Sequence, residues 1–160
     1  MINIFLEDHH QILFALLKNK VNFMPIGGYA VIHYGYDRNS GGMDIWLQTG
    51  NENRDRLIHA LRDLGITNED LEKLRRMDFT NPVPVFFFRE SPRQIDFVTK
   101  INNISFEEAI KEARYFTLEN RSIHVINYNH LIITNLSTNR AKDKADIEEL
   151  ERINKYRKNN

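Results

Sequence analysis

Two aspartates lie inside short apolar segments, where a carboxylate needs a partner. Asp44 stands within residues 43–47 (MDIWL) and Asp96 within residues 94–98 (QIDFV), and both segments have the composition of strands. An ionised carboxylate is costly to bury unless a metal, a cation or a hydrogen-bond donor satisfies it. If the two strands are neighbours, the two charges repel until a hard divalent cation such as magnesium bridges them. The pattern therefore predicts a metal site at Asp44 and Asp96.

A pair of glycines upstream of Asp44 points to phosphate chemistry. Gly27 and Gly28 end the apolar stretch 22–26 and precede a short helical stretch. At a strand-to-helix turn, exposed backbone N–H groups can hold phosphate oxygens, and glycine lets the backbone approach a ligand closely. Phosphates and carboxylates would then share one metal site. Taken alone, the two glycines also fit a plain turn.

Each of these acidic residues also has a structural interpretation. Asp44 could pair with Arg38 or cap a turn, and Asp96 could form a salt bridge with Arg93 or Arg89.

Adjacent histidines on a helix point in different directions, so we expect His9 and His10 to be exposed rather than to bind a metal. Trp46 and the aromatic run Phe86, Phe87 and Phe88 are expected in the core. The alternative is that an aromatic residue at a sheet edge stacks on a nucleobase.

The elements that must position the two aspartates follow from apolar periodicity. Helical spacing predicts helices over 5–18, 29–34, 52–64, 67–74, 105–113, 128–136 and 142–156. Capping-box patterns at Thr67 and Ser105 support two of these starts. Strand segments are expected at 22–26, 43–47, 85–88, 94–98, 115–118 and 122–126, with hairpins joining the last two pairs. This order predicts an α/β fold, a mixed sheet flanked by helices.

Length and composition limit the class of protein. The chain has 160 residues, 41% hydrophobic and 28% charged, which predicts one domain over residues 1–160, with an N-terminal helix within 1–20 and C-terminal helices within 127–160. Twenty-two basic residues balance 22 acidic ones, so no overall charge draws the protein to nucleic acid or membrane. The absence of cysteine excludes disulfides and thiolate chemistry. We expect no signal peptide, no membrane span and a cytoplasmic location.

Taken together, these motifs resemble the minimal nucleotidyltransferase superfamily, whose signature is an apolar residue, Gly, and Gly or Ser, followed by carboxylates flanking one apolar residue. Ile26-Gly27-Gly28 matches the start of that signature. The stretch 27–47 (GGYAVIHYGYDRNSGGMDIWL) looks like the small bacterial members related to abortive-infection toxins. The resemblance continues through ENRDRLIHALRDLG, RQIDFVTKI, SFEEAIKEA and NRAKDKADIEEL, and covers roughly residues 5–152.

The resemblance implies a nucleotidyltransferase fold with a two-metal magnesium site. In the family, two carboxylates hold the magnesium ions that bind a nucleoside triphosphate, and a third on a neighbouring strand completes the site and helps to activate the attacking hydroxyl. Asp44 matches the second carboxylate and Asp96 the third, so both are expected to be catalytic and to bind metal. The resemblance places phosphate or nucleotide contacts at Gly27, Gly28, Arg38, Ser40, Arg140, Lys142 and Asp143. From the residues alone, Arg38 and Ser40 could instead stabilise their loop, and the last three residues could form an exposed helix start.

The most consequential departure from the family pattern concerns a metal ligand. Gly42 stands where the first metal-binding aspartate belongs. Loss of a catalytic group of this kind commonly lowers the rate by orders of magnitude, so the expected activity is weakened. The expected function is transfer of a nucleotidyl group to an RNA or protein hydroxyl, with tRNA as one acceptor and a cognate antitoxin or toxin as a partner. The alternatives are a non-catalytic module of the same fold that binds a nucleotide or a partner, and a purely structural interaction domain.

Overall fold

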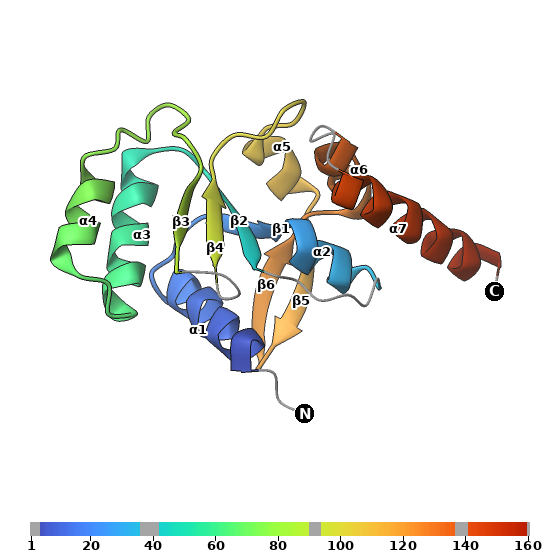
Figure 1. Cartoon of the computed structure of the whole chain (residues 1–160), viewed down its shortest axis with the longest axis horizontal. Helices are drawn as coiled ribbons and strands as arrows, with labels where there is room; N and C mark the ends of the chain where they lie inside the picture. The colour runs from blue at the N-terminus through green and yellow to red at the C-terminus, as the bar shows by residue number, and fades with distance from the viewer. Residues whose placement is uncertain (1–3, 36–41, 90–93, 137–140, 160) are drawn as a thin grey trace.

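Four short strands form a mixed sheet at the centre of the molecule (Figure 1). A computed structural model describes residues 4–35, 42–89, 94–136 and 141–159. Across the sheet the order is β1 (Phe23–Ile26), β2 (Met43–Leu47), β4 (Ile95–Val98) and β3 (Phe86–Phe88). The central pair, β2 and β4, is parallel, whereas β1 and β3 pair antiparallel at the two edges. This confirms the predicted mixed sheet and the antiparallel pairing of β3 with β4.

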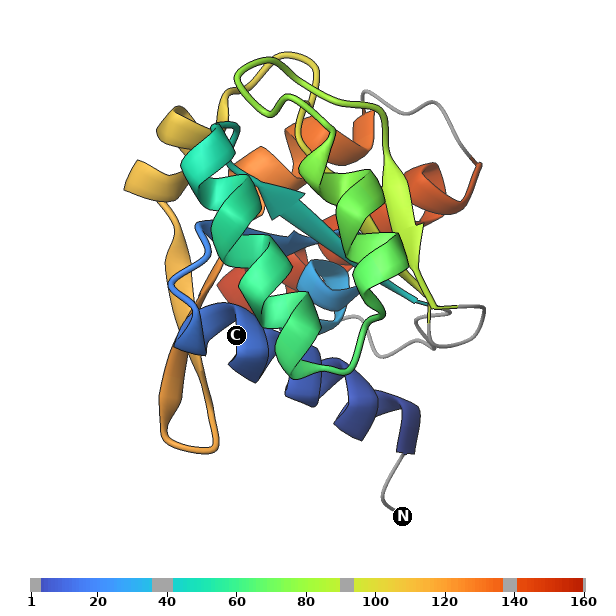
Figure 2. The same ribbon diagram turned by 90° about the vertical axis from the view of Figure 1, so that its left-hand side faces the viewer.

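Helices cover both faces of this sheet. On one face, α1 (Ile4–Lys18), α3 (Asn51–Asp63) and α4 (Asn68–Arg75) share a hydrophobic core with β2 and β4. Figure 2 shows α3 and α4 in front of the strands. On the other face, α2 (Gly27–His33), α5 (Phe106–Lys111), α6 (Tyr128–Leu136) and α7 (Ala141–Asn159) contribute to a second core around Trp46. The sheet is therefore the middle layer of an α/β structure.

Strand alternation decides which side chains face which core. Successive residues of a strand point to opposite faces. Met43 and Ile45 on β2, with Ile95 and Phe97 on β4, lie in the core beneath α1 and α3, and each is at most 1% exposed. Trp46 and Val98 belong to the opposite core. The aspartates next to these residues therefore face the side that carries α2.

A separate hairpin extends below the sheet in Figure 1. Its strands are β5 (Arg114–Leu118) and β6 (Arg121–Val125), joined by Glu119 and Asn120, which both have positive φ. The inner face contributes buried Ile123 and Val125 to the two cores. On the outer face, the Tyr115 hydroxyl and His124 Nε2 are 2.7 Å apart and share a hydrogen bond.

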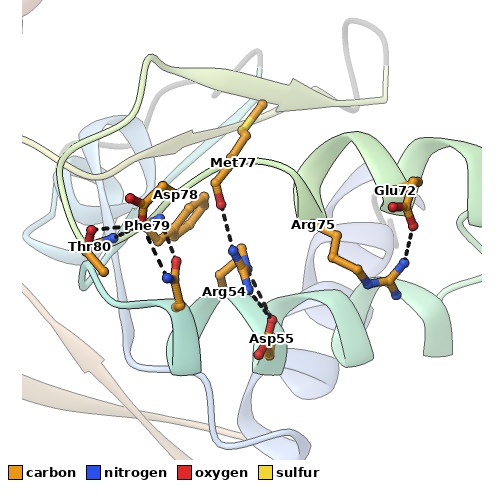
Figure 3. A network of polar contacts seen from close by, with 9 residues as sticks. Arg54, Asp55, Glu72, Arg75, Met77, Asp78, Phe79 and Thr80 are labelled. Carbon is orange, nitrogen blue, oxygen red and sulfur yellow. Dashed lines mark hydrogen bonds and ion pairs between the residues drawn. The ribbon is translucent and has the colours of Figure 1, made fainter.

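Polar contacts fix the chain where it leaves α4 and approaches the sheet edge (Figure 3). Asn51 Oδ1 accepts a 2.7 Å hydrogen bond from the Phe79 backbone N–H, and Arg54 Nη1 donates to the Met77 carbonyl at 2.8 Å. The Phe79 ring is fully buried and lies 6.1 Å from the ring of Phe86 on β3. The position of β3 is thus tied to α3 through this connection.

Both capping predictions are confirmed. Thr67 Oγ1 accepts from the Asp70 backbone N–H at 3.3 Å, and Ser105 Oγ accepts from that of Glu108 at 3.1 Å. The elements within 1–20 and 127–160 are α1 and the pair α6 and α7. Among the helices of the described residues, none combines the length and the apolar content needed to span a membrane.

Two sequence-based expectations about burial are wrong. His9 is only 2% exposed, because its place on α1 matches that of buried Ile12, Leu13 and Leu16. Phe87 is 66% exposed. It is the middle residue of a three-residue strand whose outer residues turn toward the core, so alternation places its ring on the other face.

Candidate functional site

Asp44 and Asp96 lie directly opposite each other on neighbouring parallel strands. In the register of β2 and β4, Asp44 pairs with Asp96, one step beyond the pairing of Met43 with Ile95. Neighbouring strands are about 4.8 Å apart, and residues in register share a face of the sheet. Both side chains are half-buried. The fold thus brings together two carboxylates that are 52 positions apart in the sequence (96 − 44).

The Gly27 turn lies against the Asp44 carboxylate. Ile26, the last residue of β1, pairs with Asp44, so the chain turns into α2 directly beside that residue. Gly27 has φ +61°, a left-handed conformation that favours glycine, and a Cβ added there would overlap Asp44 Oδ2. Gly28 follows as the second residue of α2. The left-handed backbone and the close approach both favour glycine at position 27.

Asp96 is oriented by a residue on its own segment. Gln94 Nε2 donates a 2.7 Å hydrogen bond to Asp96 Oδ1. A carboxylate has two oxygens and about four acceptor sites, so this bond orients the group without using its capacity to bind a further ligand. Gln94 is not among the predicted site residues, although a side chain two residues before Asp96 on an extended segment is expected on the same face.

The structure also shows what surrounds the position that departs from the family pattern. Met43 N donates to the Gln94 carbonyl at 3.0 Å, which brings the chain at Gly42 close to that carbonyl. A Cβ at Gly42 would lie 2.7 Å from Gln94 O, and backbone would have to move to accept it. A side chain at position 42 is therefore incompatible with the present start of β2.

A partly buried hydrogen bond anchors the turn to α1. His9 Nδ1 and the Tyr29 hydroxyl are 2.9 Å apart, and the two rings meet edge to face with centroids 5.3 Å apart. Burial raises the pKa of Tyr29 well above its usual range, so the hydroxyl stays protonated. Tyr29 follows the glycine pair directly, and this contact fixes the first turn of α2 against α1. The helical spacing of His9 with Ile12, Leu13 and Leu16 is the sequence signal that would have shown its burial.

The residues that pair across the sheet with Asp44 and Asp96 continue to the edge strand β3. Phe87 on β3 pairs with Asp96 and therefore lies on the same face. One row thus crosses all four strands in the order Ile26, Asp44, Asp96, Phe87. We call this the carboxylate row. It begins beside the Gly27 turn and ends at an exposed aromatic ring.

Several predicted contacts lie outside what the structure describes. Arg38, Ser40 and Arg140 are outside the described residues. Lys142 and Asp143 belong to the backbone of α7, but their side chains are outside the described part as well. The predicted nucleotide contacts of these residues therefore stay predictions, as does a pairing of Asp44 with Arg38.

The donor set suits a cation that arrives with phosphates. Within the described residues, no group of three or more His, Asp or Glu side chains is placed to hold a metal ion. Magnesium is commonly bound by one or two carboxylates together with substrate phosphates, rather than by a protein cage. The pair of Asp44 and Asp96 fits that mode of binding. Comparison with known protein families and with curated protein sequences finds no match for the chain.

Proposed function

We propose that this protein belongs to the minimal nucleotidyltransferase superfamily and binds a nucleoside triphosphate with magnesium at the carboxylate row. The proposed reaction is transfer of the nucleotidyl group of the triphosphate to a hydroxyl of an RNA or a protein, with pyrophosphate as the leaving group. The observation that carries the proposal is the register that sets Asp44 opposite Asp96, with the Gly27 turn against Asp44. The motif resemblance across residues 5–152 supports the same assignment.

Each residue of the row has a distinct role in this proposal. Asp44 and Asp96 would hold magnesium, with phosphate oxygens of the nucleotide as its further ligands. When bound, magnesium supplies positive charge against the negative charge that develops on the phosphate and its leaving group. The Gly27 turn brings backbone close to Asp44, on the side where we place the phosphates. Asp96 stands farther from that turn, and its Oδ2 is the proposed acceptor for the proton of the attacking hydroxyl, while Gln94 holds Oδ1.

The partners of the reaction follow from the resemblance. We propose tRNA or a protein as the acceptor, and a cognate toxin or antitoxin as the binding partner. Total tRNA and the purified chain itself are therefore the first acceptors to test.

The backbone around Gly42 favours a second candidate function. Because a side chain at this position would meet the Gln94 carbonyl, the chain is built around two carboxylates rather than three. A non-catalytic module that binds a nucleotide or a partner through Asp44 and Asp96 agrees with that construction. The two candidates share the site and differ only in turnover.

A transfer assay separates them. The chain is incubated with each labelled nucleoside triphosphate, magnesium and total tRNA, and label is measured on RNA and on protein. We expect transfer that is lost in Asp44→Asn and Asp96→Asn and kept in Asp55→Asn, a control on α3 whose carboxylate is 57% exposed. Binding without transfer by the unchanged chain supports the non-catalytic module. Transfer that survives both site substitutions would overturn the proposal.

Substitution of Gly42 tests the missing carboxylate. Gly42→Asp supplies the ligand that the family pattern expects, and Gly42→Ala adds only the Cβ that meets Gln94 O. Transfer by Gly42→Asp alone would identify position 42 as a lost ligand site. If both variants lose stability equally and neither transfers, the contact of the added Cβ with the Gln94 carbonyl explains why position 42 cannot carry a side chain.

A further inference from the structure

An exposed aromatic ring ends the carboxylate row. Phe87 is 66% exposed, although most large apolar side chains among the described residues are buried. Its neighbours on β3 are already packed: the Phe86 ring stacks on Phe97 with centroids 5.2 Å apart. Val85, two residues earlier, is 62% exposed, so apolar surface continues along this edge. The core does not require the Phe87 ring, and its exposure calls for another explanation.

Pairing with a second sheet is a poor explanation of that exposure. β3 is an edge strand of only three residues. Pro82 and Pro84 precede it and offer no backbone N–H, and Arg89 ends it with φ +66°. Short edge strands flanked by proline are the usual protection against pairing with another chain. The ring is accessible from the sheet face, while the strand edge is unsuited to extension.

The position of Phe87 relates it to the carboxylates instead. It pairs with Asp96, which pairs with Asp44, and the Gly27 turn lies against Asp44. A ligand with phosphates at the Gly27 end that extends along the row reaches Phe87 with its other end. Nucleotides combine phosphates with a flat aromatic base, and bases stack on exposed aromatic side chains.

We infer that Phe87 is a stacking platform for a nucleobase next to the Asp44 and Asp96 site. This inference rests on the proposed function, because it needs phosphates at the other end of the row. The base comes either from the bound nucleoside triphosphate or from the terminal nucleotide of a nucleic-acid acceptor. Both sources present the same planar surface, and the experiment below distinguishes them.

The substitution Phe87→Trp places a fluorescent indole at the proposed platform, so that stacking of a base can be measured as fluorescence quenching. The natural chain has a single tryptophan, Trp46, which is 1% exposed, so the unchanged chain titrated with the same ligands supplies the background signal. We expect quenching of the new fluorescence by a base and none by inorganic triphosphate with magnesium. Quenching by ATP, GTP, CTP or UTP assigns the base to the bound nucleotide. Quenching only by a short single-stranded RNA, with magnesium and inorganic triphosphate present, assigns it to the acceptor.

Phe87→Leu measures the contribution of the ring. Stacking on an aromatic side chain predicts roughly tenfold weaker binding of the base-bearing ligand, with unchanged binding of inorganic triphosphate. Tyr115→Leu is the matched control, because Tyr115 is 62% exposed on the hairpin and lies outside the row. Circular dichroism checks that both variants remain folded.

Three results would overturn the inference. In the first, Phe87→Leu and the unchanged chain bind every base-bearing ligand with equal affinity, while triphosphate binding still depends on Asp44 and Asp96. This result would refute the stacking platform and leave the proposed function standing. In the second, triphosphate binding does not depend on either aspartate, which would refute both the platform and the proposed function. Sedimentation that shows a dimer dissociated by Phe87→Leu, without a change in nucleotide affinity, assigns the ring to contact between two copies.

Discussion

Gly27 connects the sequence motif to the site through one backbone conformation. Its φ of +61° favours glycine, and the space where a Cβ would lie is filled by Asp44 Oδ2. The residue therefore carries two separable constraints, a conformational one and a steric one. The second constraint couples the glycine pair to the carboxylate.

Gly27→Ala should be more destabilising than the same change at a glycine that carries only the conformational constraint. Gly65 is that control, with φ +86° and no atom within 4 Å of an added Cβ. We expect Gly65→Ala to cost about 1 kcal/mol, the lower end of the cost of a left-handed alanine, and Gly27→Ala to cost more. Urea denaturation measures both free energies of unfolding. Equal costs would show that Asp44 moves away freely and that the close approach is unimportant.

At this scale the sequence identified some residues and missed others. Asp44 and Asp96 stood out because apolar neighbours flank each of them. The burial of His9 and the exposure of Phe87 were mispredicted, because residue type alone suggests an exposed histidine and a buried phenylalanine. The helical period of 3.6 places His9 on the apolar face of α1, and the strand period of 2 places Phe87 opposite its packed neighbours.

At the scale of elements, Asn53 joins the outer ends of β1 and β2 to α3. This side chain is 5% exposed. Its Oδ1 accepts from the Asn22 N–H at 2.8 Å, and its Nδ2 donates to the carbonyls of Asn22 at 3.1 Å and Gln48 at 2.8 Å. Two of the four strands that carry the row, β1 and β2, are thus held by one amide on the helix beside them.

Asn53→Ala should destabilise the protein by about 2–4 kcal/mol, because buried backbone groups lose their hydrogen-bond partners. Asn68→Ala, at the exposed start of α4, is the comparison and should change stability by less than about 0.5 kcal/mol. Thermal and chemical denaturation measure the difference. Similar effects of the two substitutions would mean that water replaces the Asn53 contacts.

The element boundaries were largely predictable, but the pairing of the strands was not. Caps at Thr67 and Ser105 and the alternation in β2 and β4 are local signals. The parallel pairing of β2 with β4 depends on helices packing on both faces, which no local pattern encodes. The register that sets Asp44 opposite Asp96 therefore came from the structure.

At the scale of the whole molecule, stability should decrease in acid in two steps. Burial lowers the pKa of His33 and of His124, while hydrogen bonds from Asn19 to Asp63 and from the Thr80 backbone to Asp78 lower the pKa of those carboxyls. A lowered pKa in the folded state means that the unfolded chain binds more protons, so stability is lost as pH falls. The imidazoles act below about pH 6.5 and the carboxyls below about pH 4.

Replacing both histidines with glutamine should flatten the first step. Urea denaturation from pH 8 to pH 5 compares the His33→Gln, His124→Gln double variant with the unchanged chain. The same slope in both proteins would assign the loss of stability to other groups. Above pH 10 the sign reverses, because burial raises the pKa of Tyr34 to about 12 and stability is lost as pH rises.

The central proposal is that Asp44 and Asp96 together bind one nucleoside triphosphate, and that this binding requires magnesium. Calorimetric titration of ATP with magnesium into the unchanged chain, Asp44→Asn, Asp96→Asn and the double variant tests it as a double-mutant cycle. We predict that each single substitution weakens binding at least tenfold, that the effects are coupled by more than about 1 kcal/mol, and that chelation of magnesium lowers the unchanged chain to the level of the double variant. Binding that is independent of magnesium and unchanged in both single variants would contradict the account.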